Sequence, residues 1–187
     1  MPWDNWNNEN LVKVLRGNGV VVMPTDTLYG IVGGALIEKT VERIYKARER
    51  NPEKPCIILI GKISELEKFS ISLSEKQKET LQTFQPVPVS MVLDCEEASL
   101  SYLHRGTKTL AFRLPNSQEL RDLLMKTGPL VAPSANIEGS TPSKNISEAR
   151  GYFGDLVDLY IDGGEIEGKA SKVIRLHEDG SIAVLRE

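Results

Sequence analysis

The apolar and polar positions of this chain follow two periods, one helical and one extended. Where apolar residues recur three and four positions apart, the pattern predicts amphipathic helices. We expect helices over Glu9–Arg16, over Glu38–Arg48, from Ser74 through Leu81 and Phe84, from Asn116 to a stop at Gly128-Pro129, and from Asn145 through Phe153. Local signals support these ends, since Gly17 follows the first helix and Ser74-Glu75-Lys76-Gln77 is a capping box.

Short apolar runs between the helices predict strands. These runs are Gly19–Met23, Pro55–Gly61, Val89–Leu93, Thr107–Leu114 and Leu130–Ala132, and two or three strands finish the chain within Val157–Ile161, Lys172–Leu176 and Ile182–Leu185. The late strands lack intervening helices, which favours a mixed sheet over a purely parallel one. We therefore expect one α/β (α+β) domain over residues 1–187, with a twisted open mixed sheet of about seven strands flanked by helices.

Composition narrows the class of protein. Hydrophobic residues make up 40% of the 187 residues and charged residues 26%, as in soluble globular proteins. No apolar run approaches the roughly 18 residues of a membrane-spanning helix, and the first residues do not resemble a signal peptide. A cytoplasmic location and no membrane partner are expected. The spacing of the two cysteines is not that of a metal site. Cys56 is predicted to be a small hydrophobic residue in the core.

The net charge of −3 provides no overall attraction for nucleic acid, so a bound polyanion requires a local cluster of cations. The strongest cluster is the run from Lys46 to Pro55, which carries Arg48, Arg50 and Lys54 between a predicted helix and a predicted strand. Arginine forks bind phosphate with two hydrogen bonds, and a lysine adds a mobile charge. The alternative is a solvated basic helix end. Two prolines in the run argue against a flexible solvated turn.

Polar side chains also follow three of the predicted strands. The first strand leads into Pro24-Thr25-Asp26-Thr27-Leu28-Tyr29-Gly30, a later one ends at Arg113, and Leu130–Ala132 leads into Pro133-Ser134-Ala135-Asn136. Polar groups at strand ends build the crevice in which open α/β sheets bind ligands. Ordinary turns and a surface ion pair of Arg113 are the alternatives.

Several familiar catalytic signatures are absent from the sequence. It has no P-loop, no G-x-G-x-x-G after a strand and no G-x-S-x-G nucleophile elbow. His104 and His177 stand apart from carboxylate-rich or cysteine-rich spacing, so both read as surface or loop residues. We predict neither a covalent nucleophile nor a protein-held metal.

Taken together, these segments resemble the YrdC-like family of L-threonylcarbamoyladenylate synthases, in its single-domain form. The resemblance rests on Pro24–Gly30, Arg48-x-Arg50…Lys54-Pro55, Ala111–Pro115, Pro133–Asn136…Gly139, Asp162-Gly163-Gly164 with Ser171, and Leu185-Arg186. It implies a YrdC-like fold with a concave basic cleft. It also implies a nucleotidyltransferase that makes threonylcarbamoyl-AMP from L-threonine, bicarbonate and ATP with Mg²⁺, releasing pyrophosphate. A tRNA threonylcarbamoyl-transferase complex would then use that product in tRNA modification.

The resemblance also assigns roles to residues. Thr25, Arg113 and Ser171 are expected to bind threonine. The expected nucleotide-binding residues are Arg48, Arg50, Lys54, Thr109, Ser134, Asn136, Ser143 and Arg186. Of these, Arg48, Arg50, Ser134 and Asn136 are the expected catalytic residues, because they would meet the reacting phosphates.

Some positions depart from the family pattern. Arg48 replaces the usual lysine, Leu59 stands where longer relatives often carry a histidine, and Phe84–Ser90 replaces W-P-G-P-[VL]-T. Pro142 falls near the family's serine, which leaves Ser143 or Thr141 to replace it. These changes leave two alternatives open: a divergent homologue with another acyl or carbamoyl substrate, and a module that binds double-stranded RNA or tRNA without nucleotidyl transfer.

Overall fold

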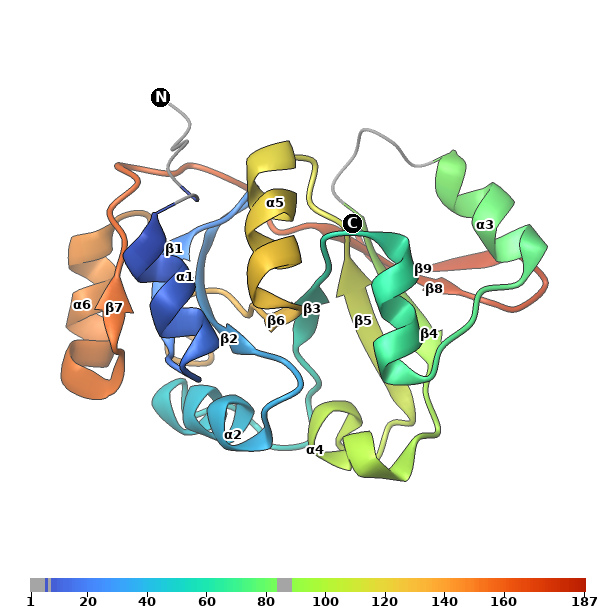
Figure 1. The fold of residues 1–187 in the computed structure, drawn as a ribbon, viewed down its shortest axis with the longest axis horizontal. Coiled ribbons are helices and arrows are strands. Elements are labelled where there is room, and N and C mark those ends of the chain that lie inside the picture. Colours follow the sequence, from blue (N-terminus) through green and yellow to red (C-terminus); the bar gives the residue numbers. More distant parts are fainter. Residues whose placement is uncertain (1–5, 7, 84–88) are drawn as a thin grey trace.

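The computed structural model describes residues 6, 8–83 and 89–187. The expected end of the third helix at Phe84 and the departure at Pro86-Val87-Pro88 lie outside the described residues. Within them, the fold is one nine-stranded mixed sheet with helices on both faces (Figure 1). This confirms the expected α/β class, and the sheet has more strands than the seven expected.

The sheet has the strand order β7-β1-β2-β6-β3-β5-β4-β8-β9. The strands are β1 (Val21–Pro24), β2 (Tyr29–Gly34), β3 (Ile57–Leu59), β4 (Val89–Asp94), β5 (Thr109–Arg113), β6 (Leu130–Val131), β7 (Leu159–Tyr160), β8 (Lys172–Leu176) and β9 (Ile182–Arg186). The pairs β1–β7, β3–β5 and β4–β8 are parallel, and the other neighbours are antiparallel.

The strand that the sequence pattern missed is β2. Three glycines among its six residues, Gly30, Gly33 and Gly34, make the segment read as a turn. The structure gives Gly33 a packing role, because a Cβ there would lie 2.4 Å from the Thr40 Cγ2 atom. The missing side chain lets the following helix lie close against the sheet.

The helices match the predicted ones within a few residues. They are α1 (Glu9–Arg16), α2 (Glu38–Ala47), α3 (Glu75–Gln82), α4 (Ser101–His104), α5 (Gln118–Thr127) and α6 (Ile146–Phe153), with 3-10 turns at Ile63–Phe69, Ala98–Leu100 and Gly154–Leu156. The capping box before α3 is formed as predicted, since the Ser74 and Gln77 side chains each bond the other's backbone N–H. The exceptions are α4 and the three 3-10 turns, which were not predicted.

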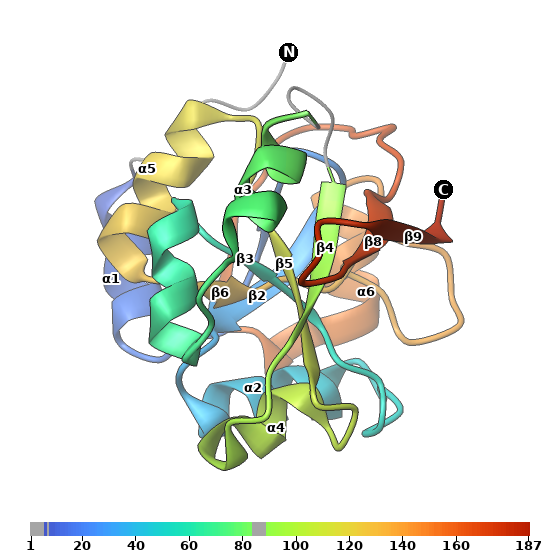
Figure 2. The ribbon, with the colours of Figure 1, turned by 90° about the vertical axis from the view of Figure 1, so that its right-hand side faces the viewer.

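Two hydrophobic cores lie on opposite faces of the sheet. Alternate residues of β1 divide between them, with Val21 and Met23 on the side of α1 and α5 and Val22 on the side of α2 and α6. Helices α1 and α5 lie side by side in both ribbon views (Figures 1 and 2).

Both histidine predictions can be checked against the fold. The prediction for His104 was wrong, because this residue ends α4 with 7% of its surface exposed and its Nδ1 accepts a hydrogen bond from the Gly106 N–H. His177 lies exposed in the turn between β8 and β9, as predicted. Within the described residues, no helix is long and apolar enough to span a membrane.

Candidate functional site

A cavity of about 420 Å³ lies where segments distant in the sequence meet. Its walls come from the β1–β2 turn, the end of α2, the start of β3, β5, the segment after β6, the segment before β8 and the end of β9. Predicted site residues that line it are Thr25, Arg48, Arg50, Arg113, Ser134, Ser171 and Arg186. Predicted residues outside the lining are Lys54, Thr109, Asn136 and Ser143.

Arg48 is the C-cap of α2 and is 3% exposed. The sequence left a solvated basic helix end as the alternative to a phosphate-binding cluster. Arg48 is not solvated, because it is buried and its Nε donates to the carbonyl oxygens of Ser134 and Asn136 at 2.9 and 3.1 Å. Its Nη2 lies 3.4 Å from both the Ser134 Oγ and the Asn136 Oδ1. The two polar side chains therefore face the same guanidinium group.

Every one of those four acceptors is neutral, so the charge of Arg48 is buried without a carboxylate in its hydrogen-bond shell. Its Nη1 is buried and has no hydrogen-bond partner among the described residues. Burial, together with repulsion from Arg50, lowers the pKa of Arg48 from its ordinary value. A buried cation of this kind is stabilised by an anion that enters the cavity.

Arg113 is 4% exposed and pairs with a carboxylate. Its Nη2 donates to the Asp26 Oδ1 at 2.9 Å and lies 3.5 Å from the Thr25 Oγ. The alternative of a surface ion pair is wrong, because both side chains of the pair are under 10% exposed, at 5% and 7%. Burial lowers the pKa of Arg113, and Asp26 opposes that shift.

Arg50 and Lys54 belong to one loop but differ in orientation. Arg50 lines the cavity, and it donates from Nε to the Lys54 carbonyl at 3.0 Å and from Nη2 to the Pro55 carbonyl at 2.8 Å. The Lys54 ammonium instead pairs with Glu138 at 2.9 Å, with its side chain 59% exposed. Lys54, predicted to reach the nucleotide, thus lies outside the cavity lining and pairs with Glu138.

Ser171 and Arg186 form a third polar corner of the cavity. The Ser171 Oγ lies 2.8 Å from the Ser90 Oγ, and the Ser171 carbonyl accepts from Nη2 of Arg186 at 2.8 Å. The Thr25 hydroxyl is likewise engaged locally, donating to the Leu28 carbonyl at 2.7 Å. The protein thus orients these groups before any ligand arrives.

The remaining predicted residues take structural positions. Asn136 is 4% exposed and donates from Nδ2 to the Ile137 and Ser140 carbonyls, which orients its Oδ1 toward Arg48. The Ser143 hydroxyl donates to the Ala135 carbonyl and closes the same loop. Thr109 begins β5, four residues before Arg113, and its hydroxyl lies 3.1 Å from the Thr107 Oγ. The structure therefore does not bring Thr109 and Ser143 to the cavity.

Cys56 and Leu59, both singled out in the sequence, are buried, but only Cys56 lines the cavity. Cys56 is 4% exposed, as predicted for a small hydrophobe, and burial raises the pKa of its thiol. Leu59 is fully buried in the core beneath α1 and α5 and is not part of the cavity lining.

The cavity carries an excess of positive charge. Arg48, Arg50, Arg113 and Arg186 line it, whereas no carboxylate is among its described lining residues. Asp26, which is not among the lining residues, neutralises Arg113. The other three guanidinium groups bond neutral oxygens. Guanidinium forks and hydroxyls in this arrangement suit a polyanion such as a triphosphate beside a smaller polar molecule.

Sequence reasoning missed three residues that shape the cavity: Asp26, Glu138 and Tyr29. Asp26 and Tyr29 lie within the Pro24–Gly30 run, so their closeness to Thr25 in the sequence could have marked them as site residues. Glu138 follows Asn136 by two residues, but no pattern marks it as the partner of Lys54.

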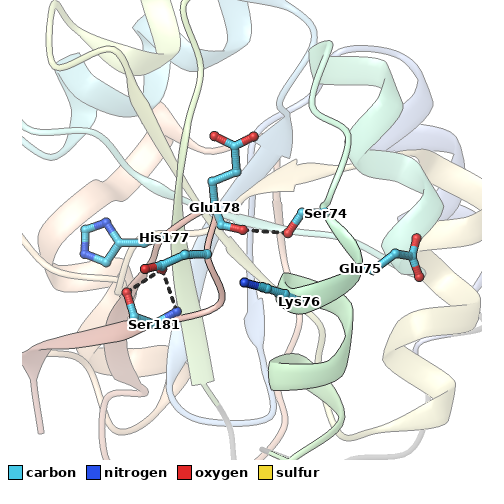
Figure 3. A pocket seen from close by; sticks show the side chains of 7 residues that line it. Ser74, Glu75, Lys76, His177, Glu178 and Ser181 are labelled. Carbon is cyan, nitrogen blue, oxygen red and sulfur yellow. Dashed lines mark hydrogen bonds between the residues drawn. The ribbon is translucent and has the colours of Figure 1, made fainter.

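A second depression lies far from these residues, between the start of α3 and the β8–β9 turn (Figure 3). There the Ser74 Oγ donates to the Glu178 carbonyl at 2.7 Å, and the Asp179 carboxylate accepts from Ser181. Lys76 and carboxylates both line it, and both of its hydroxyls are already hydrogen-bonded within the protein. It therefore lacks the single-sign charge of the arginine-lined cavity.

Comparisons with known proteins agree with this fold. The profile of the Sua5_yciO_yrdC family, described as Telomere recombination, matches residues 13–187. Bacillus subtilis threonylcarbamoyl-AMP synthase is 34% identical over 154 residues, which cover 81% of this chain and 44% of that protein.

Solved structures give the same result. Pyrococcus abyssi Sua5 complexed with L-threonine superposes with a TM-score of 0.85 at 31% identity, covering 97% of this chain and 54% of that one. Escherichia coli YciO superposes with a TM-score of 0.81 at 25% identity, covering 95% of this chain and 87% of that one. The chain therefore spans about half the length of the first two relatives and most of the third.

Proposed function

This chain belongs to the Sua5/YciO/YrdC family, and we propose that it makes threonylcarbamoyl-AMP from L-threonine, bicarbonate and ATP, with residues 1–187 forming one YrdC-like domain. Relatives that carry the name threonylcarbamoyl-AMP synthase support this activity, as does the Pyrococcus structure that holds L-threonine. Pyrophosphate is the second product, and the enzyme is a nucleotidyltransferase.

The observation that carries the proposal is the uncompensated charge of the cavity. Three of its four arginines bond only neutral oxygens in the contacts described, and Arg48 does so while 3% exposed. Each charge-assisted hydrogen bond to a phosphate contributes about 1.5–3 kcal/mol. A triphosphate is therefore the ligand whose charge this cavity fits best.

The family resemblance suggests a role for each lining residue, and we propose these roles for the cavity. Arg48, Arg50 and Arg186 bind the nucleotide and its phosphates, and Ser134 donates its hydroxyl beside Arg48. Arg113 binds the carboxylate of threonine, with Thr25 and Ser171 completing that end of the cavity. Asn136 acts through Arg48, because its carboxamide oxygen faces that guanidinium.

The reaction needs positioning and charge neutralisation more than acid–base catalysis. The threonine amine and bicarbonate give an N-carboxylate as the C–N bond forms and water leaves, and an oxygen of this carboxylate attacks the α-phosphorus of ATP. That P–O bond forms as the bond to the β-phosphate oxygen breaks, and pyrophosphate leaves with the electron pair. Fixed guanidinium groups stabilise the charge that builds on the phosphate oxygens, which explains why no catalytic triad is required.

Magnesium enters this scheme as part of the MgATP substrate. Across the part of the chain that the structure describes, no group of three His, Cys, Asp or Glu side chains is arranged to hold a metal ion, and the cavity lining contains no carboxylate. This donor set does not suit a magnesium ion held by protein side chains, since Mg²⁺ prefers oxygen ligands that include carboxylates.

The rival function is binding of double-stranded RNA or tRNA. A duplex backbone is contacted by exposed lysines and arginines, whereas Arg48 and Arg113 are 3% and 4% exposed. Their burial favours a small ligand that enters the cavity.

The proposed function implies one further partner, the tRNA threonylcarbamoyl-transferase complex that consumes the product. We propose that the enzyme acts in the cytoplasm.

The test combines the purified protein with ATP, Mg²⁺, L-threonine and bicarbonate. We expect pyrophosphate release and a product with the mass of threonylcarbamoyl-AMP, both dependent on threonine and bicarbonate. No turnover in the complete mixture, with every component verified, would contradict the proposal. Binding of duplex RNA that weakens linearly with log salt, without turnover, would instead support the RNA-binding module.

Titration calorimetry separates the third possibility. A divergent homologue with another acyl substrate would bind a non-hydrolysable ATP analogue but not L-threonine. The proposed synthase binds both.

Arg43→Met is the control for variants of the cavity arginines, because it removes an arginine outside the cavity. Arg43 lies on α2 with its side chain 45% exposed and pairs with Asp158.

A further inference from the structure

One segment of the cavity wall has no regular secondary structure. Residues 161–171, called the strap below, join β7 to β8 without a helix or strand. Both ends are fixed: the Ile161 N–H donates to the Val22 carbonyl at 2.9 Å, and the Ser171 Oγ lies 2.8 Å from the Ser90 Oγ. The last two strap residues, Ala170 and Ser171, line the cavity.

Between its ends the strap is mostly exposed, and one side chain from the sheet holds it. The Tyr29 hydroxyl donates to the Gly164 carbonyl at 2.8 Å and accepts from the Gly163 N–H at 2.8 Å. Tyr29 itself is fully buried on β2 and lines the cavity. Burial raises its pKa, so the phenol stays protonated and able to donate.

Two backbone contacts show how closely the strap lies on the site. A Cβ atom at Gly168 would lie 1.5 Å from the Thr27 carbonyl oxygen, so only glycine permits this approach to the β1–β2 turn. The Ile166 N–H donates to the Lys144 carbonyl at 2.8 Å, in the segment that follows β6. The strap therefore bridges two walls of the cavity.

We propose that Tyr29 is a positioning residue whose hydroxyl latches the strap over the cavity and so holds Ala170 and Ser171 where the amino acid binds. This inference rests on the proposed function for the identity of the amino acid. At the nucleotide end, Arg48 and Arg50 bond other segments and do not depend on the latch, whereas Arg186 bonds the strap through the Ser171 carbonyl. Loss of the latch therefore weakens amino-acid binding more than nucleotide binding.

The main test is Tyr29→Phe, which keeps the ring and removes both hydrogen bonds. We expect the KM for threonine to rise about tenfold, the change that follows from losing one or two hydrogen bonds, while the KM for ATP stays within about twofold. Amide hydrogen exchange over residues 162–170 should become faster. The matched control is Tyr102→Phe, which removes a hydroxyl that donates to the Ala35 carbonyl at 3.0 Å, away from the cavity.

Gly168→Ala tests the same strap without touching Tyr29, and we expect the same selective rise in the threonine KM. Strap exchange in Tyr29→Phe equal to that in Tyr102→Phe would overturn the latch. Faster exchange with unchanged threonine binding, or an equal loss for ATP, would overturn the positioning role. A wild-type protein that does not bind threonine would instead contradict the proposed function, and the exchange data would still decide the latch.

Discussion

Arg113 and Asp26 form a buried ion pair, with 2.9 Å between the Arg113 Nη2 and the Asp26 Oδ1, across 87 residues of sequence. Arg113 ends β5 and Asp26 follows β1, and three strands lie between β1 and β5 in the sheet. In a flat sheet, four spacings of about 4.8 Å would separate those two strands by roughly 19 Å. The sheet therefore curls, and the β1–β2 turn reaches back across its face to enclose the cavity.

Breaking this ion pair should destabilise the protein. Asp26→Ala leaves the Arg113 charge buried without its partner, and removing one member of a buried pair costs about 3–5 kcal/mol. We expect a loss of that size in the free energy of unfolding, measured by urea denaturation. Adding Arg113→Met should recover part of the loss, because the stranded charge is removed.

The control for this prediction is an exposed ion pair. Glu75 pairs with Lys78, and their side chains are 85% and 51% exposed. Glu75→Gln should therefore cost less than about 1 kcal/mol. Equal losses for the two single variants would show that the Asp26–Arg113 pair contributes no more than a surface contact.

The elements with strong local signals could be predicted from the sequence. Helix α1 matches its predicted bounds, β8 does so too, and the capping box before α3 is formed. The grouping of Thr25, Arg113 and Ser134 also follows from the sequence, because polar residues end a predicted strand in each case. Local periodicity and turn chemistry suffice for these features.

Long-range contacts account for what the sequence could not provide. The glycines of β2 made this strand look like a turn in the sequence. Their presence is explained by the packing of α2, because a Cβ at Gly33 would clash with Thr40. His104 was predicted to be a surface residue because no hydrophobic periodicity in the sequence indicated helix α4. The pairing of Lys54 with Glu138 spans 84 residues, so a cation predicted for phosphate proved to be held at the rim.

Glu138 makes the 50–55 loop sensitive to acid. The Asn51 backbone N–H, and then the Lys54 ammonium, hold the pKa of Glu138 below its ordinary value. A lowered folded-state pKa means that the stabilisation is fully present above the unfolded value of about 4.3 and is lost as the pH falls through the folded value. Glu138→Gln should thus lower the Tm at pH 7, and the difference from wild type should shrink below about pH 4.

Thermal denaturation between pH 3 and pH 7 measures this effect. Glu79→Gln, at an exposed position on α3, controls for the loss of one negative charge. A Tm difference for Glu138→Gln that stays constant across this range would contradict the linkage.

Serine should be a poor substrate. It differs from threonine by one methyl group, and one such group in a binding pocket is worth about 1–3 kcal/mol. We therefore expect kcat/KM for L-serine to be lower by roughly 10- to 200-fold, measured as pyrophosphate release. Equal turnover of the two amino acids would show that the cavity does not contact the methyl group.

Arg48 should contribute to nucleotide binding far more than to stability. Arg48→Met removes a buried charge that bonds only neutral oxygens, but it also leaves the Asn136 carbonyl without this donor. These effects oppose each other, so we expect the free energy of unfolding to change by less than about 2 kcal/mol.

Losing two charge-assisted bonds to phosphate should weaken binding of an ATP analogue at least about a hundredfold. Arg48→Lys keeps the charge without the fork and should weaken it about tenfold. Calorimetry with the analogue measures both variants, and binding by Arg48→Met equal to that of Arg43→Met would remove Arg48 from the nucleotide site.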